Sequence, residues 1–300
     1  MNREKLDKGN LNKKEIYTVN WKIVLRLSFV EFQRWMRSSR LIILCVMLVF
    51  VNELIILPLK ECASLMGENL SVAEAFLALG NSGTIVLVVP VLYLVLMADF
   101  PQKGGIDLLY QIRCSKKVWI LGQVMFVLET VLFLVVFLVV SSSLMILSYA
   151  EWRMEFSYAV THFVSTFPER RNDYLVQLVP ENLYQQMTMG AALMHTIFMM
   201  SLHFLFLALV LLLSALCNKK LFGIFIDGFL LILGAVTCGE NMAIRWMFPM
   251  AHTIPWVHFE PYLRKEIFPV SGSYFYLIGC CIFLFISCMT VSGKYQVGKA

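Results

Sequence analysis

Long apolar runs constrain this chain more than any other feature. Residues 118–148 contain one charged side chain and residues 187–216 contain none, and further runs approach the roughly 20 residues that a helix needs to cross a bilayer. Charged residues make up 15% of the chain, whereas a soluble globular protein carries roughly 25%. The sequence therefore predicts an all-α, multi-pass membrane protein.

Six transmembrane helices are expected, over residues 41–59, 83–99, 118–148, 187–216, 221–237 and 273–292. Residues 16–300 would form one transmembrane domain, preceded by a mobile, polar cytoplasmic tail over residues 1–15. Of the 25 lysines and arginines, 18 fall on the side that carries both termini. Because cytoplasmic loops are enriched in basic residues, both termini are expected in the cytoplasm.

Residues 16–37 show helical spacing of apolar side chains, with basic residues on the opposite side. This pattern predicts an amphipathic helix that lies in the membrane interface, with Trp21, Phe32 and Trp35 on the apolar face and Arg26 on the polar face. A helix packed on a soluble partner domain is the alternative. The interface is favoured because the first span follows directly at Leu41.

Two segments are expected on the outer side. Residues 149–186 separate two overlong spans and would form a small external cap rather than a folded domain. Residues 238–272 are interrupted by four prolines and rich in aromatic rings, which predicts short re-entrant or interfacial helices before the last span. A disulfide between Cys62 and Cys238 is one alternative for these two cysteines, and two free thiols is the other.

A polar island over residues 99–123 separates the second and third spans. Pro101 and the Gly104–Gly105 pair would end any incoming helix, and residues 106–112 can form a short amphipathic helix. Basic residues follow at the start of the next apolar run. A short helix held at the cytoplasmic surface could receive a push from a soluble partner.

The order of features in this island resembles the loop between the second and third spans of ABC-2 type transporter permeases. The matching positions are Gly105, Asp107, Leu108, Leu109, Lys116, Lys117, Ile120, Leu121 and Gly122. Gln123 stands in place of the usual lysine and Cys114 in place of a common proline, and no glutamate precedes the glycine. The resemblance also covers the hydropathy plan, the amphipathic helix before the first span and the re-entrant helices before the last.

This resemblance implies the permease subunit of a bacterial ABC exporter in the cell membrane. A separate ABC ATP-binding subunit would hold ATP and Mg, and a second permease subunit, identical or homologous, would complete a dimer. The expected ATPase coupling residues are Gly105, Ile106, Asp107, Leu108, Leu109, Tyr110 and Arg113. The small external elements favour a hydrophobic or amphipathic substrate, such as an antimicrobial peptide or a drug. No nucleic-acid partner is expected.

Several polar residues lie within the apolar runs and are candidates for a transport pathway or dimer seam. An ionisable group within a span is costly and is by default a functional hypothesis. For Glu129 a structural role is equally open, and for Glu53 and Asp227 it is favoured. Glu129 would share one helix face with Gly122 and Met125, and His195 and His203 would share a face of the fourth span.

Two other functions are weighed against transport. A membrane enzyme could use Glu129 with His195 or His203, provided that these groups converge in one wet cavity. A non-transporting sensor or assembly subunit would need no continuous cavity. The chain contains no P-loop, G-x-S-x-G or zinc-protease motif and no metal-ligand spacing, so it is expected to be no enzyme and to bind no cofactor or metal itself.

Overall fold

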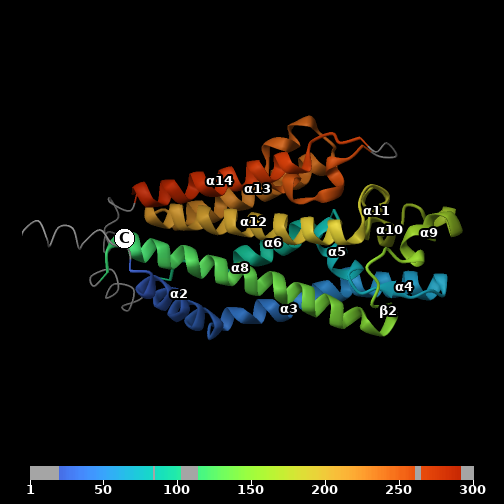
Figure 1. The fold of residues 1–300 in the computed structure, drawn as a ribbon, viewed down its shortest axis with the longest axis horizontal. Helices are drawn as coiled ribbons and strands as arrows, with labels where there is room; N and C mark the ends of the chain where they lie inside the picture. The colour runs from blue at the N-terminus through green and yellow to red at the C-terminus, as the bar shows by residue number, and fades with distance from the viewer. Residues whose placement is uncertain (1–19, 84, 103–113, 261–264, 292–300) are drawn as a thin grey trace, which may run out of the picture.

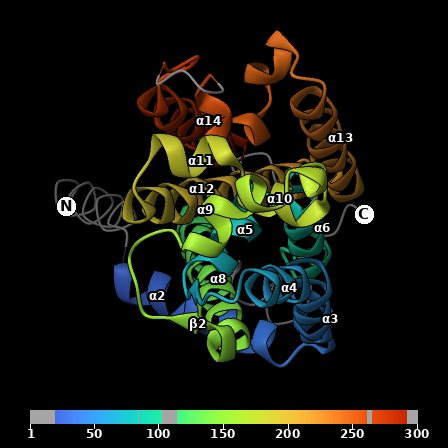
Figure 2. The ribbon, with the colours of Figure 1, turned by 90° about the vertical axis from the view of Figure 1, so that its right-hand side faces the viewer.

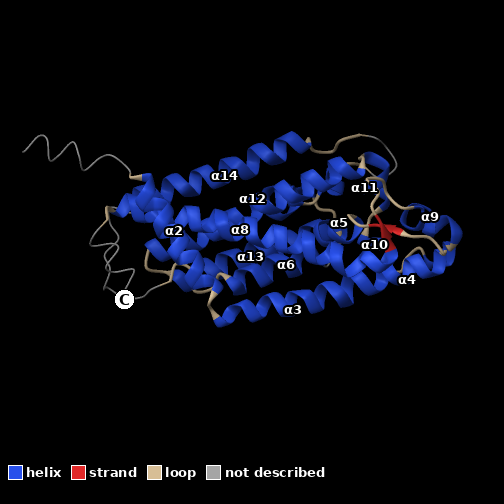
Figure 3. Ribbon diagram, turned by 60° about the horizontal axis from the view of Figure 1, so that its bottom comes forward, coloured by secondary structure: helices blue, strands red, loops and turns tan. Residues whose placement is uncertain are grey.

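The computed structural model describes residues 20–83, 85–102, 114–260 and 265–291. This part of the chain is mostly helical, as Figure 3 shows, and the long helices run along the long axis of the molecule (Figure 1). It contains 5 helices long and apolar enough to cross a membrane, or up to 6 if one bent pair counts as a single span. The prediction of an all-α, multi-pass membrane protein is confirmed at this level.

The first span runs from Ser39 to Met66. It combines a 3₁₀ turn η1 (Ser39–Leu41), α3 (Ile42–Val51), a π-helical turn η2 (Asn52–Ile56) and α4 (Leu57–Met66). The other four spans are single helices: α8 (Lys116–Ile146), α12 (Met189–Leu216), α13 (Lys220–Gly239) and α14 (Val270–Val291).

Over the expected span at residues 83–99 the structure has a short helix after a sharp bend, which is a sixth span only if the bent pair of helices counts as one. The helix there, α6 (Ile85–Leu96), has 12 residues and contains Pro90, so it is about 18 Å long at 1.5 Å per residue. It is bent by 83° from α5 (Glu74–Asn81), and all of α5 is buried. Near the bend, the Asn81 amide donates to the Leu77 carbonyl and to the Thr196 hydroxyl. The Asn81 amide nitrogen is therefore paired inside the protein, whereas its Oδ1 is buried without a hydrogen-bond partner among the described residues.

Helix α12 forms the centre of the bundle. Viewed down the long axis, it lies between α8 on one side and α13 and α14 on the other (Figure 2). Of the apolar 18-residue stretch that makes α12 a candidate span, 67% is buried, whereas 17% to 39% is buried in the corresponding stretches of the other four spans. Since a helix that is apolar all round must be covered by protein or lipid, α12 is the core helix and the others present a face outward.

Short elements close one end of the bundle. They are η3 (Leu147–Tyr149), the parallel strand pair β1 (Leu70–Ser71) and β2 (Ala150–Glu151), α9 (Tyr158–Thr166), η4 (Pro168–Arg170), α10 (Tyr174–Leu178) and α11 (Glu181–Gln186). The proline-rich segment forms three 3₁₀ turns, η5 (Ala243–Met247), η6 (Pro249–Thr253) and η7 (Pro255–His258), against α13, α12 and α14. Cys62 and Cys238 are both free thiols, so the disulfide alternative is not formed here.

Candidate functional site

Helix α2 (Trp21–Met36) packs obliquely along α8, at the end of the bundle where α8 begins and α14 ends (Figure 1). Asn20 caps it by accepting a hydrogen bond from the Lys22 amide. The face against the bundle is made by residues spaced three or four apart: Val24, Leu27, Ser28, Glu31 and Trp35. Helix α2 is therefore packed against the bundle as part of it, and does not lie only in the membrane interface beside it.

The predicted interfacial residues divide between two faces of α2. Trp35 is 4% exposed and Phe32 packs partly buried beside it, whereas Trp21 is 57% exposed. Arg26 is exposed as well. The single apolar face read from the sequence is in fact two stripes, one against α8 and one facing outward, where lipid headgroups would meet Trp21.

Gly122 and Glu129 of α8 both face α2. A Cβ at Gly122 would overlap the Leu27 side chain, so the glycine permits the close approach of the two helices. Two turns further along, the Ser28 hydroxyl donates to Glu129 Oε1 at 2.9 Å. The face of α8 that was predicted to line a pathway or dimer seam is thus covered by α2 of the same chain. Met125, on the same face, is partly buried.

Aromatic rings pack across the contact between α2 and α8. Trp35 packs edge-on against Phe126 and Phe133, with ring centroids 6.4 and 5.8 Å apart. Phe32 also meets Phe133 edge-on at 6.0 Å. Phe100, just before the polar loop, lies 5.5 Å from Phe126. Such pairs contribute about 0.5–1.5 kcal/mol each beyond the burial of their area.

Polar contacts tie the same corner to the segment that leads into the loop. Arg40 forms an ion pair with Asp99 at 2.5 Å, and Arg34 donates to the Gln102 side chain at 3.4 Å. Arg34 also pairs with the buried Glu31 at 3.3 Å. Residues 99–102 are therefore joined to α2 and to the start of the first span. The predicted coupling residues of this loop, Gly105 to Arg113, lie outside the described residues.

A second group of polar side chains meets in the bundle interior. Asp227 of α13 is fully buried, and neither carboxyl oxygen has a hydrogen-bond partner among the described residues. Tyr93 of α6 lies near Asp227 and Thr130 of α8, and all three are 0% exposed. The sequence pointed to Asp227 alone. Thr130 carries no charge and stands next to Glu129, and Tyr93 is an isolated polar group in an apolar run, so neither has a distinct signal in the sequence.

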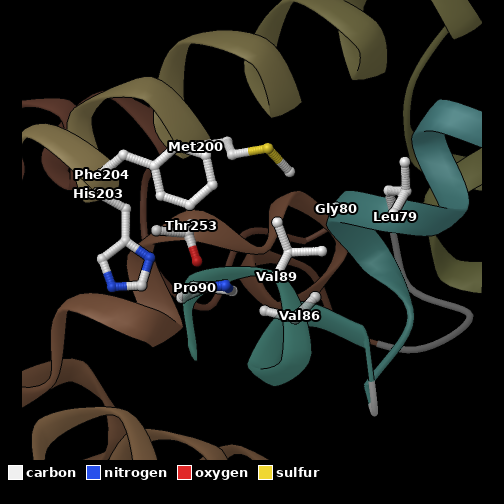
Figure 4. Close-up of a pocket in the computed structure, with 9 residues that line it drawn as sticks. All are labelled: Leu79, Gly80, Val86, Val89, Pro90, Met200, His203, Phe204 and Thr253. Carbon is white, nitrogen blue, oxygen red and sulfur yellow. The ribbon is translucent and has the colours of Figure 1, made fainter. Parts of the chain in front are cut away.

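The two histidines of α12 have different surroundings. His195 Nδ1 lies 2.9 Å from the Tyr274 hydroxyl of α14. His203 is buried and lines a cavity of about 20 Å³, together with Gly80 and Thr253 (Figure 4). This volume is enough for about one water molecule. The structure does not join either histidine to Glu129, whose hydrogen bond leads to α2.

A larger cavity lies near the strand pair, where β1 and β2 meet α5, α8 and α12. It has a volume of about 220 Å³ and is mostly apolar. Its lining includes Phe76, Val139, Ser143, Trp152 and Arg153. This cavity could not be predicted from the sequence, because its walls come from four separate segments of the chain.

Among the described residues, no group of three or more His, Cys, Asp or Glu side chains is placed to hold a metal ion. Comparisons of the chain with models of known protein families, with curated proteins and with solved structures find no match.

Proposed function

We propose that this chain is the membrane-spanning permease subunit of an ATP-driven exporter of the ABC-2 type, paired with a second permease subunit and with separate ATP-binding subunits. One observation supports the proposal most. The segment that enters the polar loop is bound both to α2 and to the first span, through Arg34–Gln102 and Arg40–Asp99. A push on the loop would therefore reach two elements at once.

The mechanism follows from how α2 is fixed. ATP-driven closure of the partner subunits would displace the loop over residues 103–113 and, with it, the joined segment 99–102. Helix α2 would carry this displacement to α8, because Leu27 sits against Gly122 and the Ser28 hydroxyl bonds to Glu129. Packed helices transmit small shifts because closely packed interiors deform little. The bundle would then rock against its partner half.

The substrate class is inferred from the larger cavity. Its lining is mostly apolar and includes Trp152 and Arg153, whose charge is already paired with Glu151, and this fits a mostly apolar molecule with some polar character. This favours a hydrophobic or amphipathic peptide or a drug-like molecule. The cell membrane of a bacterium, with both termini in the cytoplasm, remains the proposed location.

The enzyme alternative has less support than transport. It requires Glu129 and a histidine to converge on one reacting atom. Glu129 instead bonds to Ser28 on α2, while His195 meets Tyr274 on α14. A sensor or assembly subunit stays as the second candidate, and it differs from a permease in having no ATP-driven flux.

A charge swap at the loop entrance tests the coupling. Arg40→Asp should repel Asp99 and lower export at least tenfold in vesicles that contain the chain and its co-purified ATPase, while ATP hydrolysis continues. The double variant Arg40→Asp with Asp99→Arg should restore export by re-forming the pair. Arg37→Asp is the matched control, because this exposed arginine lies three residues earlier, between α2 and η1. Unchanged export in Arg40→Asp would contradict the proposed coupling.

A further inference from the structure

Two histidines and one serine form a continuous chain of contacts between the 3₁₀ turns and α14. His252 Nδ1 lies 2.7 Å from Ser273 Oγ, and His258 Nε2 lies 2.6 Å from the same oxygen. The other ring nitrogens face backbone carbonyls: His252 Nε2 is 2.9 Å from Trp246 O, and His258 Nδ1 is 3.0 Å from Ile254 O. All three side chains are at most 1% exposed.

A count of hydrogens shows how many protons this chain of contacts can bind. It has four contacts, and each needs one hydrogen between its two heavy atoms. Two neutral imidazoles and one hydroxyl supply three, because a neutral ring carries one N–H and serine one O–H. One added proton fills the fourth contact. A second added proton would make Ser273 Oγ accept from both rings and would leave the serine's own hydrogen without a partner in this chain of contacts. It would also place two cations on either side of one hydroxyl.

The surroundings oppose positive charge more than they favour it. Burial lowers the pKa of His258 to about 4, and it lowers the pKa of His252 as well. Rings of Trp246, Phe268 and Tyr276 enclose the pair, and they would favour one cation at most.

Every ring nitrogen is engaged by Ser273 or by a carbonyl oxygen, so no carboxylate compensates a charge directly. The titratable groups on the elements packed around the chain of contacts, in the part of the protein described, include Lys220, Asp227, Cys238, Glu240, Arg245, His195, His203, Glu181, Tyr184, Glu260, Lys265, Glu266, Tyr274, Tyr276, Cys280, Cys281 and Cys288.

We propose that His252, Ser273 and His258 form a proton-operated clasp, which holds the turns η6 and η7 on α14 and releases them in acid. The closed clasp binds at most one added proton, whereas the released segment exposes two ordinary histidines that bind two. Release therefore takes up at least one proton. By linkage, acid must favour the released state.

The clasp also controls access to the interior. Thr253 of η6 is one wall of the cavity that contains His203 and Gly80 (Figure 4). The next turn, η7, is held to the bundle by Trp256 Nε1, which donates to the Asn81 carbonyl at 2.8 Å. Release of η6 would remove that wall and open the space between α5, α6 and α12. This inference does not depend on the proposed transport function.

Hydrogen–deuterium exchange on the full chain in detergent tests the clasp. After correction for the intrinsic pH dependence of exchange, the opening of amides in residues 249–258 should increase about tenfold per pH unit below pH 6 for one proton taken up. The double variant His252→Gln with His258→Gln keeps hydrogen-bonding groups but cannot titrate, so its corrected exchange should not change with pH. His162→Gln, an exposed histidine on α9, should behave like the unmodified chain.

Corrected exchange of residues 249–258 that stays constant from pH 7.5 to pH 5 in the unmodified chain would overturn the proposal without any variant. Equal pH dependence in the unmodified chain and in a folded double Gln variant would overturn it too. If the double variant does not fold, Ser273→Ala removes only the bridging hydroxyl. It should raise the exchange of the same amides already at pH 7.5. Ser287→Ala, near the C-terminal end of α14, should not raise it.

Discussion

Individual residues on the α2–α8 contact explain why these helices pack as they do. Gly122 leaves no room for a Cβ opposite Leu27, and Glu129 finds its hydroxyl partner in Ser28. The sequence indicated that this face of α8 is special, since Gly122 and Glu129 lie on one side of an apolar helix. It did not indicate the partner, because helix spacing shows which residues share a face but not which element covers that face.

Gly122→Ala should destabilise the protein by about 1–3 kcal/mol, the usual cost of overpacking. Leu27→Ala should recover part of this loss in the double variant, because the two residues interact directly. Gly228→Ala is the control: nothing lies near a Cβ there, so it should be neutral or slightly stabilising. Thermal unfolding in detergent measures all four proteins. Equal losses at the two glycines would contradict the contact.

Two substitutions of Glu129 distinguish a structural role of its carboxyl group from a functional one. Glu129→Leu removes the acceptor for Ser28 and should cost about 1 kcal/mol of stability, whereas Glu129→Gln retains a carbonyl acceptor and should cost less. If export also needs the ionised group, the Gln variant should assemble and hydrolyse ATP but lose export. Glu53→Leu is the control, since Glu53 is exposed on the first span and accepts a hydrogen bond from the adjacent Asn52. Stability equal to the unmodified chain in Glu129→Leu would contradict the contact with Ser28.

At the scale of elements, the long helices could be predicted and the break before α6 could not. Apolar length alone identified α8, α12, α13 and α14. The segment 83–99 looked like a span because its composition is apolar, but Pro90 lies inside a helix of 12 residues and the chain bends by 83° before it. Composition does not distinguish a straight span from a bent pair of short helices, of which α5 is wholly buried and α6 is partly exposed at Val91 and Val95.

For helix α2, too, the sequence pattern does not show which apolar residues are covered by protein. Its period of apolar residues was read as one face, yet Trp35 is buried at 4% exposure while Trp21 is 57% exposed. Trp35→Ala should therefore cost about 3–5 kcal/mol or prevent folding, as for a buried aromatic residue. Trp21→Ala should leave unfolding in detergent nearly unchanged. Equal effects of the two substitutions would contradict the packing of α2 on α8.

For the whole molecule, the distribution of basic residues sets the expected orientation. In a background without the exposed native cysteines, Arg170→Cys and Glu260→Cys should react with a membrane-impermeant reagent from outside intact cells. Lys103→Cys and Lys219→Cys should react only after the membrane is opened. Labelling of Lys103→Cys in intact cells would reverse the orientation and remove the loop from the cytoplasm.

Co-purification of an ATPase tests the central claim, that a cytoplasmic ATP-binding subunit acts on this chain through its polar loop. The full chain, isolated from its native membrane, should retain a subunit that hydrolyses ATP. Leu108→Asp with Leu109→Asp should lose that subunit while still inserting into the membrane, because the change places charge on an apolar contact. Lys219→Asp, in the other turn on the same side, should retain it. ATPase retained in equal amount by the Leu108–Leu109 double variant, or absent from the unmodified chain, would contradict the account.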